Sequence, residues 1–122
     1  MPKKILIIED DKILADMYAI KFEKEGYDVI ETQSGIAGLD MAKKEKPNVI
    51  LLDVILPEMD GFTILEEIKK TAGMEKIPIV LLTNLGQQGD VEKGKALGAA
   101  AYLTKSNTTP ADVIKRVKEL IK

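Results

Sequence analysis

The sequence contains no cysteine and no histidine. Without cysteine, the chain can form neither disulfides nor thiolate metal sites. Without histidine, it lacks the usual zinc ligands and the base of Ser-His and Cys-His catalysis. Any chemistry must therefore use carboxylates, lysine, threonine and the backbone.

Long hydrophobic runs and a dominant charge are also missing. Residues Met1–Lys4 lead into only four strongly apolar residues, far fewer than a signal peptide or a membrane span needs. The 18 Lys and Arg residues nearly balance the 20 Asp and Glu residues, for a net charge of −2. No overall field therefore draws the chain to nucleic acid or to a membrane. We expect a cytoplasmic protein that binds neither of them directly.

The composition that remains is typical of one globular domain. Hydrophobic residues make up 45% of the 122 residues and charged residues 31%, which suits a folded chain with a single core. No linker, low-complexity tract or repeat interrupts the sequence. We expect one domain over residues 1–122, with no effector domain in this chain.

Five short apolar runs predict the strands of a sheet. Three of them are apolar without interruption, which is typical of parallel strands buried on both faces. Two weaker runs are expected at the sheet edges. The strong runs are Ile5–Ile8, Val49–Leu52 and Ile77–Leu82, and the weak ones are Tyr27–Glu31 and Ala99–Leu103.

Segments of helical length separate these runs. In the last segment, five apolar residues between Val113 and Ile121 share one helical face, while lysines occupy the other. Gly26 and Gly98 favour helix ends, because glycine adopts a positive φ at little cost. The other expected helices are Asp11–Glu25, Ser34–Lys44, Gly61–Thr71 and Gln88–Leu97.

The alternation of strands and helices predicts the fold class. Repeated strand–helix–strand units require a parallel sheet with right-handed crossovers and helices on both faces. We therefore expect a doubly wound α/β fold with five strands in the flavodoxin-like order 2-1-3-4-5 and five helices. In such sheets, ligands bind beyond the carboxyl ends of the strands where the strand order reverses. Here that point lies between the first and third strands.

Acidic residues follow both of those strands. Glu9, Asp10 and Asp11 come directly after the first strand, and Asp53 comes directly after the third. Carboxylates brought this close raise each other's pKa, and a divalent cation would relieve the repulsion. Mg²⁺ is the preferred ion, because it binds carboxylate oxygens and leaves positions for phosphoryl oxygens.

Each residue also has a simpler interpretation. The acids after the first strand suit a helix N-terminus capped by Asp10 or Asp11, which alone is the better explanation. Asp53 alone suits a turn as well as a site. Thr83 and Lys105 follow the fourth and fifth strands, where a hydroxyl and a solvated lysine are ordinary. Four strand ends with polar groups together favour a site, because such a lysine and threonine can bind phosphoryl oxygens.

Four segments resemble the receiver domain of two-component response regulators. Their order, spacing and placement at strand ends are specific in combination, and the resemblance covers essentially the whole chain. The segments are Lys4–Asp11 (KILIIEDD), Val49–Gly61 (VILLDVILPEMDG), Pro78–Thr83 (PIVLLT) and Gly98–Lys105 (GAAAYLTK).

The resemblance implies a switch that is not an enzyme for other substrates. Asp53 would accept a phosphoryl group from a histidine kinase or a phosphotransfer protein. Mg²⁺ would be held by Asp10 directly, by Glu9 largely through water, by Asp53, and by the backbone carbonyl of Ile55. The domain would promote only its own phosphorylation and dephosphorylation.

The resemblance also implies how phosphorylation changes the conformation of the domain and which surface a partner contacts. Thr83 would bind a phosphoryl oxygen, Lys105 would pair with the acyl phosphate, and Tyr102 would turn inward; a half-buried edge aromatic is the simpler explanation for Tyr102. The fourth helix, fifth strand and fifth helix would contact a downstream protein or effector domain. We expect a monomer or a weak, phosphorylation-dependent dimer.

Several positions depart from the family pattern. Lys105 is followed by Ser106 instead of proline, and a cis bond there would cost roughly 2.5–4 kcal/mol, so we expect a trans bond or a strained loop. Asn84 replaces the usual small residue, which should alter access to the acyl phosphate. Ile55 and Leu85 are apolar where the family tunes the attacking water, which predicts slow self-dephosphorylation.

Three other function classes have requirements that differ from those of a receiver domain. A protein-interaction module of the same fold would not depend on phosphate. A haloacid-dehalogenase-like phosphatase needs a second acid two residues after its nucleophile, where this chain has Ile55. A flavin-binding protein needs a phosphate-cradling loop after the first strand, where Glu9–Asp11 would repel phosphate.

Overall fold

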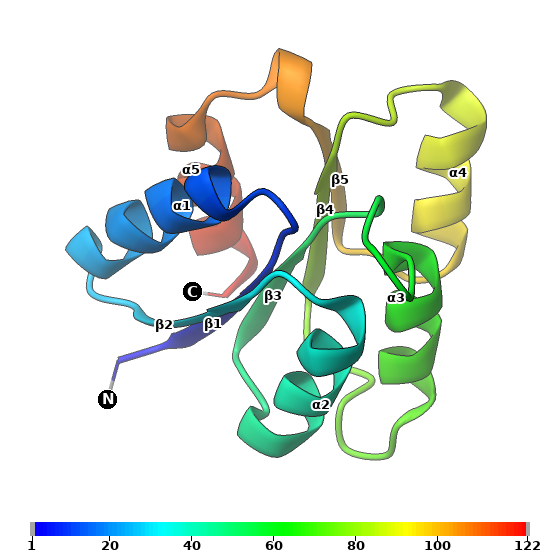
Figure 1. Cartoon of the computed structure of the whole chain (residues 1–122), viewed down its shortest axis with the longest axis horizontal. Helices are drawn as coiled ribbons and strands as arrows, with labels where there is room; N and C mark the ends of the chain where they lie inside the picture. The colour runs from blue at the N-terminus through cyan, green and yellow to red at the C-terminus, as the bar shows by residue number, and fades with distance from the viewer. Residues whose placement is uncertain (1, 122) are drawn as a thin grey trace.

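The computed structural model describes residues 2–121, in which five strands alternate with five α-helices (Figure 1). The strands are β1 (Lys4–Ile8), β2 (Asp28–Thr32), β3 (Val49–Leu52), β4 (Ile79–Thr83) and β5 (Ala101–Thr104). The helices are α1 (Lys12–Lys24), α2 (Gly35–Glu45), α3 (Gly61–Lys70), α4 (Gln88–Ala96) and α5 (Pro110–Leu120), with a 3₁₀ turn, η1 (Lys105–Asn107), before α5.

All neighbouring strands pair in parallel, and the sheet order is β2-β1-β3-β4-β5. The predicted order 2-1-3-4-5 and the doubly wound fold class are confirmed. Ile8 pairs in register with Leu52, so the residues that follow β1 and β3 leave the sheet side by side. The weak apolar runs form the two edge strands, as expected.

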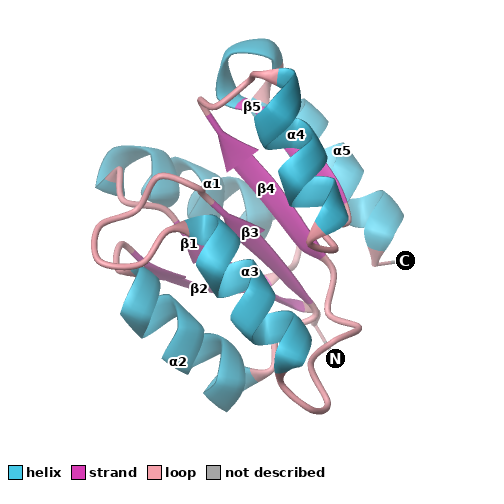
Figure 2. Ribbon diagram, turned by 90° about the vertical axis from the view of Figure 1, so that its right-hand side faces the viewer, coloured by secondary structure: helices cyan, strands magenta, loops and turns pink. Residues whose placement is uncertain are grey.

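Helices cover both faces of the sheet. Helices α1 and α5 lie on one face, and α2, α3 and α4 lie on the other (Figures 1 and 2). Alternate residues of β1 therefore enter different cores: Ile5 and Ile7 pack with Phe22 of α1, whereas Leu6 and Ile8 pack with residues of α2 and α3. Burial on both faces explains why the central strands are apolar at every position.

Three strands begin later than predicted, β2 by one residue and β4 and β5 by two. β4 starts at Ile79 because Pro78 has no N–H for the sheet, although its carbonyl oxygen accepts from Ile50 N at 3.1 Å. β5 starts at Ala101, because Ala99 N still bonds to Gly94 O at the end of α4.

The helix ends at the two predicted glycines and the peptide bond after Lys105 agree with the sequence-based expectations. Gly26 and Gly98 have φ values of 92° and 102° and follow helix ends. No peptide bond in residues 2–121 is cis, so the Lys105–Ser106 bond is trans. None of the helices in this range is long and apolar enough to cross a membrane.

The tight contact between α2 and β1 can be tested at Gly38. A β-carbon there would lie 2.6 Å from Ile8 Cδ1. Gly38→Ala should lower the free energy of unfolding by about 1–2 kcal/mol, because overpacking outweighs the better helix propensity of alanine. Gly89→Ala in α4 is the matched control, since no atom lies within 4 Å of its β-carbon position. It should raise stability by up to about 1 kcal/mol. Equal shifts of the urea midpoint would contradict this difference.

Candidate functional site

The carboxyl ends of β1 and β3 bring three acids together. Asp53 N donates to Ile8 O at 2.9 Å, so Asp53 and Glu9 leave adjacent strands at the same level. Both side chains are buried, each residue being 4% exposed, while Asp10 is exposed. One carboxylate oxygen of each acid lies within 4.8 Å of the others. The structure thus gathers acids that are more than 40 residues apart in the sequence.

Asp11 does not belong to this group. Its side chain accepts from Leu14 N at 3.1 Å and caps α1. The capping interpretation therefore holds for Asp11, while Asp10 faces Glu9 and Asp53.

Lys105 joins the two buried acids. It begins the η1 turn after β5, and its side chain is 17% exposed. The Lys105 Nζ atom lies 2.6 Å from Glu9 Oε1 and 2.8 Å from Asp53 Oδ2. One ammonium facing three carboxylates leaves an excess of negative charge, which favours a cation.

Burial perturbs the titration of this group. It raises the pKa of Glu9 to about 7, against the hydrogen bonds from Lys105 and from Asp11 N. Burial lowers the pKa of Lys105, but its hydrogen bonds to Asp53 and Glu9 outweigh this effect and hold the pKa above its ordinary value. Glu9 is therefore close to protonation at neutral pH, whereas Lys105 stays charged.

Thr83 and Tyr102 meet at the loop after β4. Thr83 is the last residue of β4 and is fully buried, and its Oγ1 accepts from Leu85 N at 3.4 Å. The half-buried Tyr102 donates its hydroxyl to Leu85 O at 2.6 Å. The Tyr102 ring also lies against Gly94 of α4, where an added β-carbon would be 2.8 Å from the ring. Leu85 therefore links the end of β4 to β5.

The loop after β3 folds back onto Asp53. Ile55 N donates to Asp53 Oδ1 at 3.1 Å, while the Ile55 side chain points outward and is 52% exposed. A β-carbon at Gly61 would lie 2.3 Å from Asp53 O, so only glycine fits there. Nothing in the sequence pattern predicts this role for Gly61, because the close approach appears only when the loop is closed.

The donor atoms suit a divalent cation. Glu9, Asp10 and Asp53 offer only carboxylate oxygens, and together they can converge on one ion. Oxygen donors are the ligands that Mg²⁺ prefers, and Mg²⁺ commonly binds one or two carboxylates and keeps several waters. The residues of this cluster therefore fit Mg²⁺.

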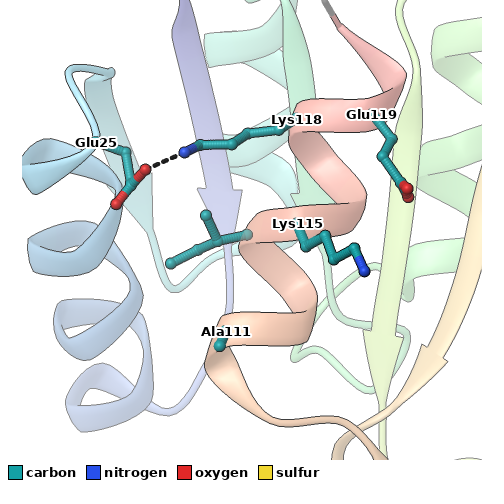
Figure 3. Close-up of a pocket in the computed structure, with 6 residues that line it drawn as sticks. Glu25, Ala111, Lys115, Lys118 and Glu119 are labelled. Atoms are coloured by element: carbon teal, nitrogen blue, oxygen red, sulfur yellow. Dashed lines mark hydrogen bonds and ion pairs between the residues drawn. The ribbon is translucent and has the colours of Figure 1, made fainter.

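A separate surface hollow of about 560 Å³ lies between the end of α1 and α5 (Figure 3). An ion pair between Lys118 and Glu25 crosses it. Its lining shares no residue with the acidic cluster, and three of its charged residues, Glu25, Lys118 and Glu119, are in local ion pairs. The acidic cluster is thus the better candidate for chemistry. The hollow is lined by Glu25, Ala111, Ile114, Lys115, Lys118 and Glu119.

The sequence model of the response regulator receiver domain matches residues 5–118. The chain belongs to the response regulator receiver family. The general function of this family is a phosphorylation-controlled switch in two-component signalling, and its members are regulatory domains. They bind Mg²⁺ at an acidic site, which here corresponds to the cluster of Glu9, Asp10 and Asp53.

Individual relatives of this receiver domain differ in length. The DNA-binding dual master transcriptional regulator RpaA of Synechocystis is 40% identical over the whole of this chain, which spans 50% of that protein. The polar-differentiation response regulator DivK of Brucella anthropi is 32% identical over 90% of this chain and 89% of its own length. The Mn²⁺-bound form of response regulator Rcp1 is 32% identical with a TM-score of 0.82, covering 98% of this chain and 91% of that one.

The pKa of Glu9 predicts how stability depends on pH without a divalent cation. The folded pKa of about 7 exceeds the ordinary value of 4.5, so between these pH values the folded chain binds more protons than the unfolded chain. Stability must then fall as the pH rises from 5 to 8, by up to about 3 kcal/mol from this group. Glu9→Gln should reduce this fall in urea unfolding experiments at both pH values.

Glu67→Gln is the matched control for this experiment. Glu67 is exposed on α3, so its replacement should leave the pH dependence unchanged. A wild-type protein that is equally stable at pH 5 and pH 8 would contradict the raised pKa of Glu9.

Proposed function

We propose that Asp53 accepts a phosphoryl group and that this modification switches the output of the domain. One observation carries the proposal: the buried carboxylate of Asp53 is paired with Lys105 at 2.8 Å and shares a possible cation site with Glu9 and Asp10. The residues around a paired, buried carboxylate at the edge of a rigid sheet hold it in position to attack a phosphorus atom.

The residues support an in-line transfer from a phosphorylated histidine. A carboxylate oxygen of Asp53 attacks phosphorus, and the bond from phosphorus to the donor nitrogen breaks with its electron pair remaining on nitrogen. An ionised carboxylate needs no general base. Lys105 then pairs with the new phosphoryl group, and the hydroxyl of Thr83 donates to one of its oxygens.

The divalent cation would be bound by Asp10, Asp53 and the backbone carbonyl of Ile55, with Glu9 acting largely through water. When bound, it neutralises charge on the phosphoryl oxygens. The oxygen donors of the cluster support this assignment, as does the Mn²⁺-bound form of the relative Rcp1.

The phosphodonor is proposed to be a histidine kinase or a phosphotransfer protein. Large apolar side chains are exposed on the segments that follow β1, β2 and β3: Ile13 is 83% exposed in the first turn of α1, Ile36 is 47% exposed in the first turn of α2, and Ile55 is 52% exposed. Each follows the carboxyl end of a strand. Exposed apolar residues around a charged site favour a protein donor over a small molecule alone.

We propose that a partner binds the surface formed by α4, β5 and α5 and there detects whether Asp53 is phosphorylated. The hydrogen bond from Tyr102 to Leu85 O couples β5 to the loop after Thr83, so movement of Thr83 toward a phosphoryl group would move Tyr102. The partner would be a downstream protein or an effector domain; RpaA, which is named as DNA-binding, is twice as long as this chain. For residues 1–122 we propose a receiver domain alone.

Phosphorylation of Asp53 can be tested by intact-mass analysis. The wild-type protein, incubated with a small phosphodonor and Mg²⁺, should gain the mass of one phosphoryl group. Asp53→Asn should gain nothing, because an amide oxygen is a poor nucleophile. Asp40→Asn, which replaces an exposed acid on α2, is the matched control and should be modified like the wild type.

Failure of the wild-type protein to gain mass would favour the alternative, an interaction module of the same fold that does not depend on phosphate. Modification that persists in Asp53→Asn would place the acceptor elsewhere.

The phosphoryl group should be long-lived. Ile55 lies at the exposed mouth of the site and Leu85 packs partly against the core, so neither side chain can orient an attacking water through a hydrogen bond. After donor removal, the phosphorylated mass should decay over minutes or longer. Ile55→Asn should shorten this lifetime several-fold by offering an amide to that water. A wild-type half-life of seconds would contradict the prediction.

A further inference from the structure

The loop between β3 and α3 carries Ile55, and a contact with α2 holds its tip. Ser34 Oγ donates to Glu58 Oε1 at 2.8 Å. Ser34 Oγ also accepts from Ala37 N at 3.2 Å and caps α2. The hydroxyl of Ser34 therefore serves the helix and the loop at once, and these two bonds use its donor and an acceptor lone pair.

The backbone of Glu58 adopts a conformation that favours glycine. Its φ is 71°, and the hydrogen bond from Met59 N to Pro57 O at 2.8 Å closes a three-residue turn around it. This form of γ-turn, with a positive φ, is rare and strained. Glycine would remove that strain but would lose the carboxylate. The strain is compatible with a functional use of the glutamate side chain.

The tip of the loop also packs tightly against α2. A β-carbon at Gly35 would lie 2.4 Å from Met59 O, so the first turn of α2 touches the loop backbone directly. The base of the same loop is closed at Gly61, where a β-carbon would lie 2.3 Å from Asp53 O. Ile55 lies between these two fixed points.

Hydrogen bonds continue from this contact to the acidic cluster. Ser34 N donates to Thr32 Oγ1 at 3.3 Å, and Glu9 N donates to Thr32 O at 3.1 Å. The path from Glu9 through Thr32 and Ser34 to Glu58 therefore joins the ends of β1 and β2 to the loop that follows β3. The path lies on the side of β1 where β2, the edge strand, pairs with it.

We propose that Ser34 and Glu58 form a clamp that positions the loop after Asp53, and with it the backbone of Ile55, for binding of a divalent cation. Both are positioning residues, since neither belongs to the acidic cluster. The inference rests on the proposed function in assigning the cation to that cluster. According to the clamp proposal, cation affinity depends on the Ser34–Glu58 contact as well as on the acidic cluster.

Two variants of Glu58 separate positioning from charge and from stability. Glu58→Gly removes the strained backbone, so the free energy of unfolding should stay the same or rise, yet Mg²⁺ affinity should fall roughly 10-fold, the low end of the loss seen for outer-shell partners of metal ligands. Glu58→Asp keeps the negative charge but is too short to reach Ser34. It should lose affinity to a similar degree.

Variants of Ser34 test the contact from the other side. Ser34→Asp keeps a good N-cap for α2 but places a carboxylate against Glu58, so Mg²⁺ affinity should fall. Adding Glu58→Gln to Ser34→Asp should restore the affinity to within about twofold of the wild type, because the glutamine amide donates to the new carboxylate. A residue that acted only as a helix cap would show neither the loss nor the rescue.

Isothermal titration calorimetry with Mg²⁺, together with urea unfolding of each variant, decides the question. Loss of affinity in both Glu58→Gly and Glu58→Asp, with no loss of stability in Glu58→Gly, and rescue in the double variant would support the clamp. Wild-type affinity in both Glu58 variants would overturn the clamp and leave the proposed function intact. A wild-type protein that does not bind Mg²⁺ at all would overturn both proposals.

Discussion

The shared ion pair of Lys105 with Glu9 and Asp53 is the interaction on which the site depends. Two carboxylates are buried at the edge of the sheet, with Lys105 Nζ at 2.6 Å and 2.8 Å from their oxygens. Buried charges without partners would be strongly destabilising. The lysine makes this burial tolerable, but one ammonium cannot balance the acids completely. The remaining negative charge gives the site its affinity for a cation.

The parallel sheet makes this arrangement possible. Strands β1, β3 and β4 are apolar at nearly every position because helices cover both faces, so their carboxyl ends form a rigid edge. Polar residues follow the apolar strands at that edge, where Glu9 and Asp53 emerge side by side. The trans bond after Lys105 and the following η1 turn show that this chain places its lysine without the proline usual in the family.

The loops around the edge are held by backbone contacts as much as by side chains. Gly35 and Gly61 allow α2 and the start of α3 to approach the loop after Asp53 more closely than any other residue would permit. The loop after β4 is fixed differently, through Leu85, which is bonded to both Thr83 and Tyr102. One loop is thus closed by tight packing, while the other is linked to the proposed output face by a hydrogen bond that can break.

The sequence alone was sufficient for the fold class, the strand order and the identity of the acidic cluster. Continuous apolar runs indicate strands buried on both faces, and parallel strands must end at a common edge, so residues such as Asp53 could be located without coordinates. The start of β4 was misplaced because apolar character continues through Pro78, which cannot donate to the sheet. The burial that raises the pKa of Glu9, its pairing with Lys105 and the contact of Ser34 with Glu58 came only from the tertiary structure. These features depend on distances between side chains from different elements, which hydrophobic periodicity does not encode.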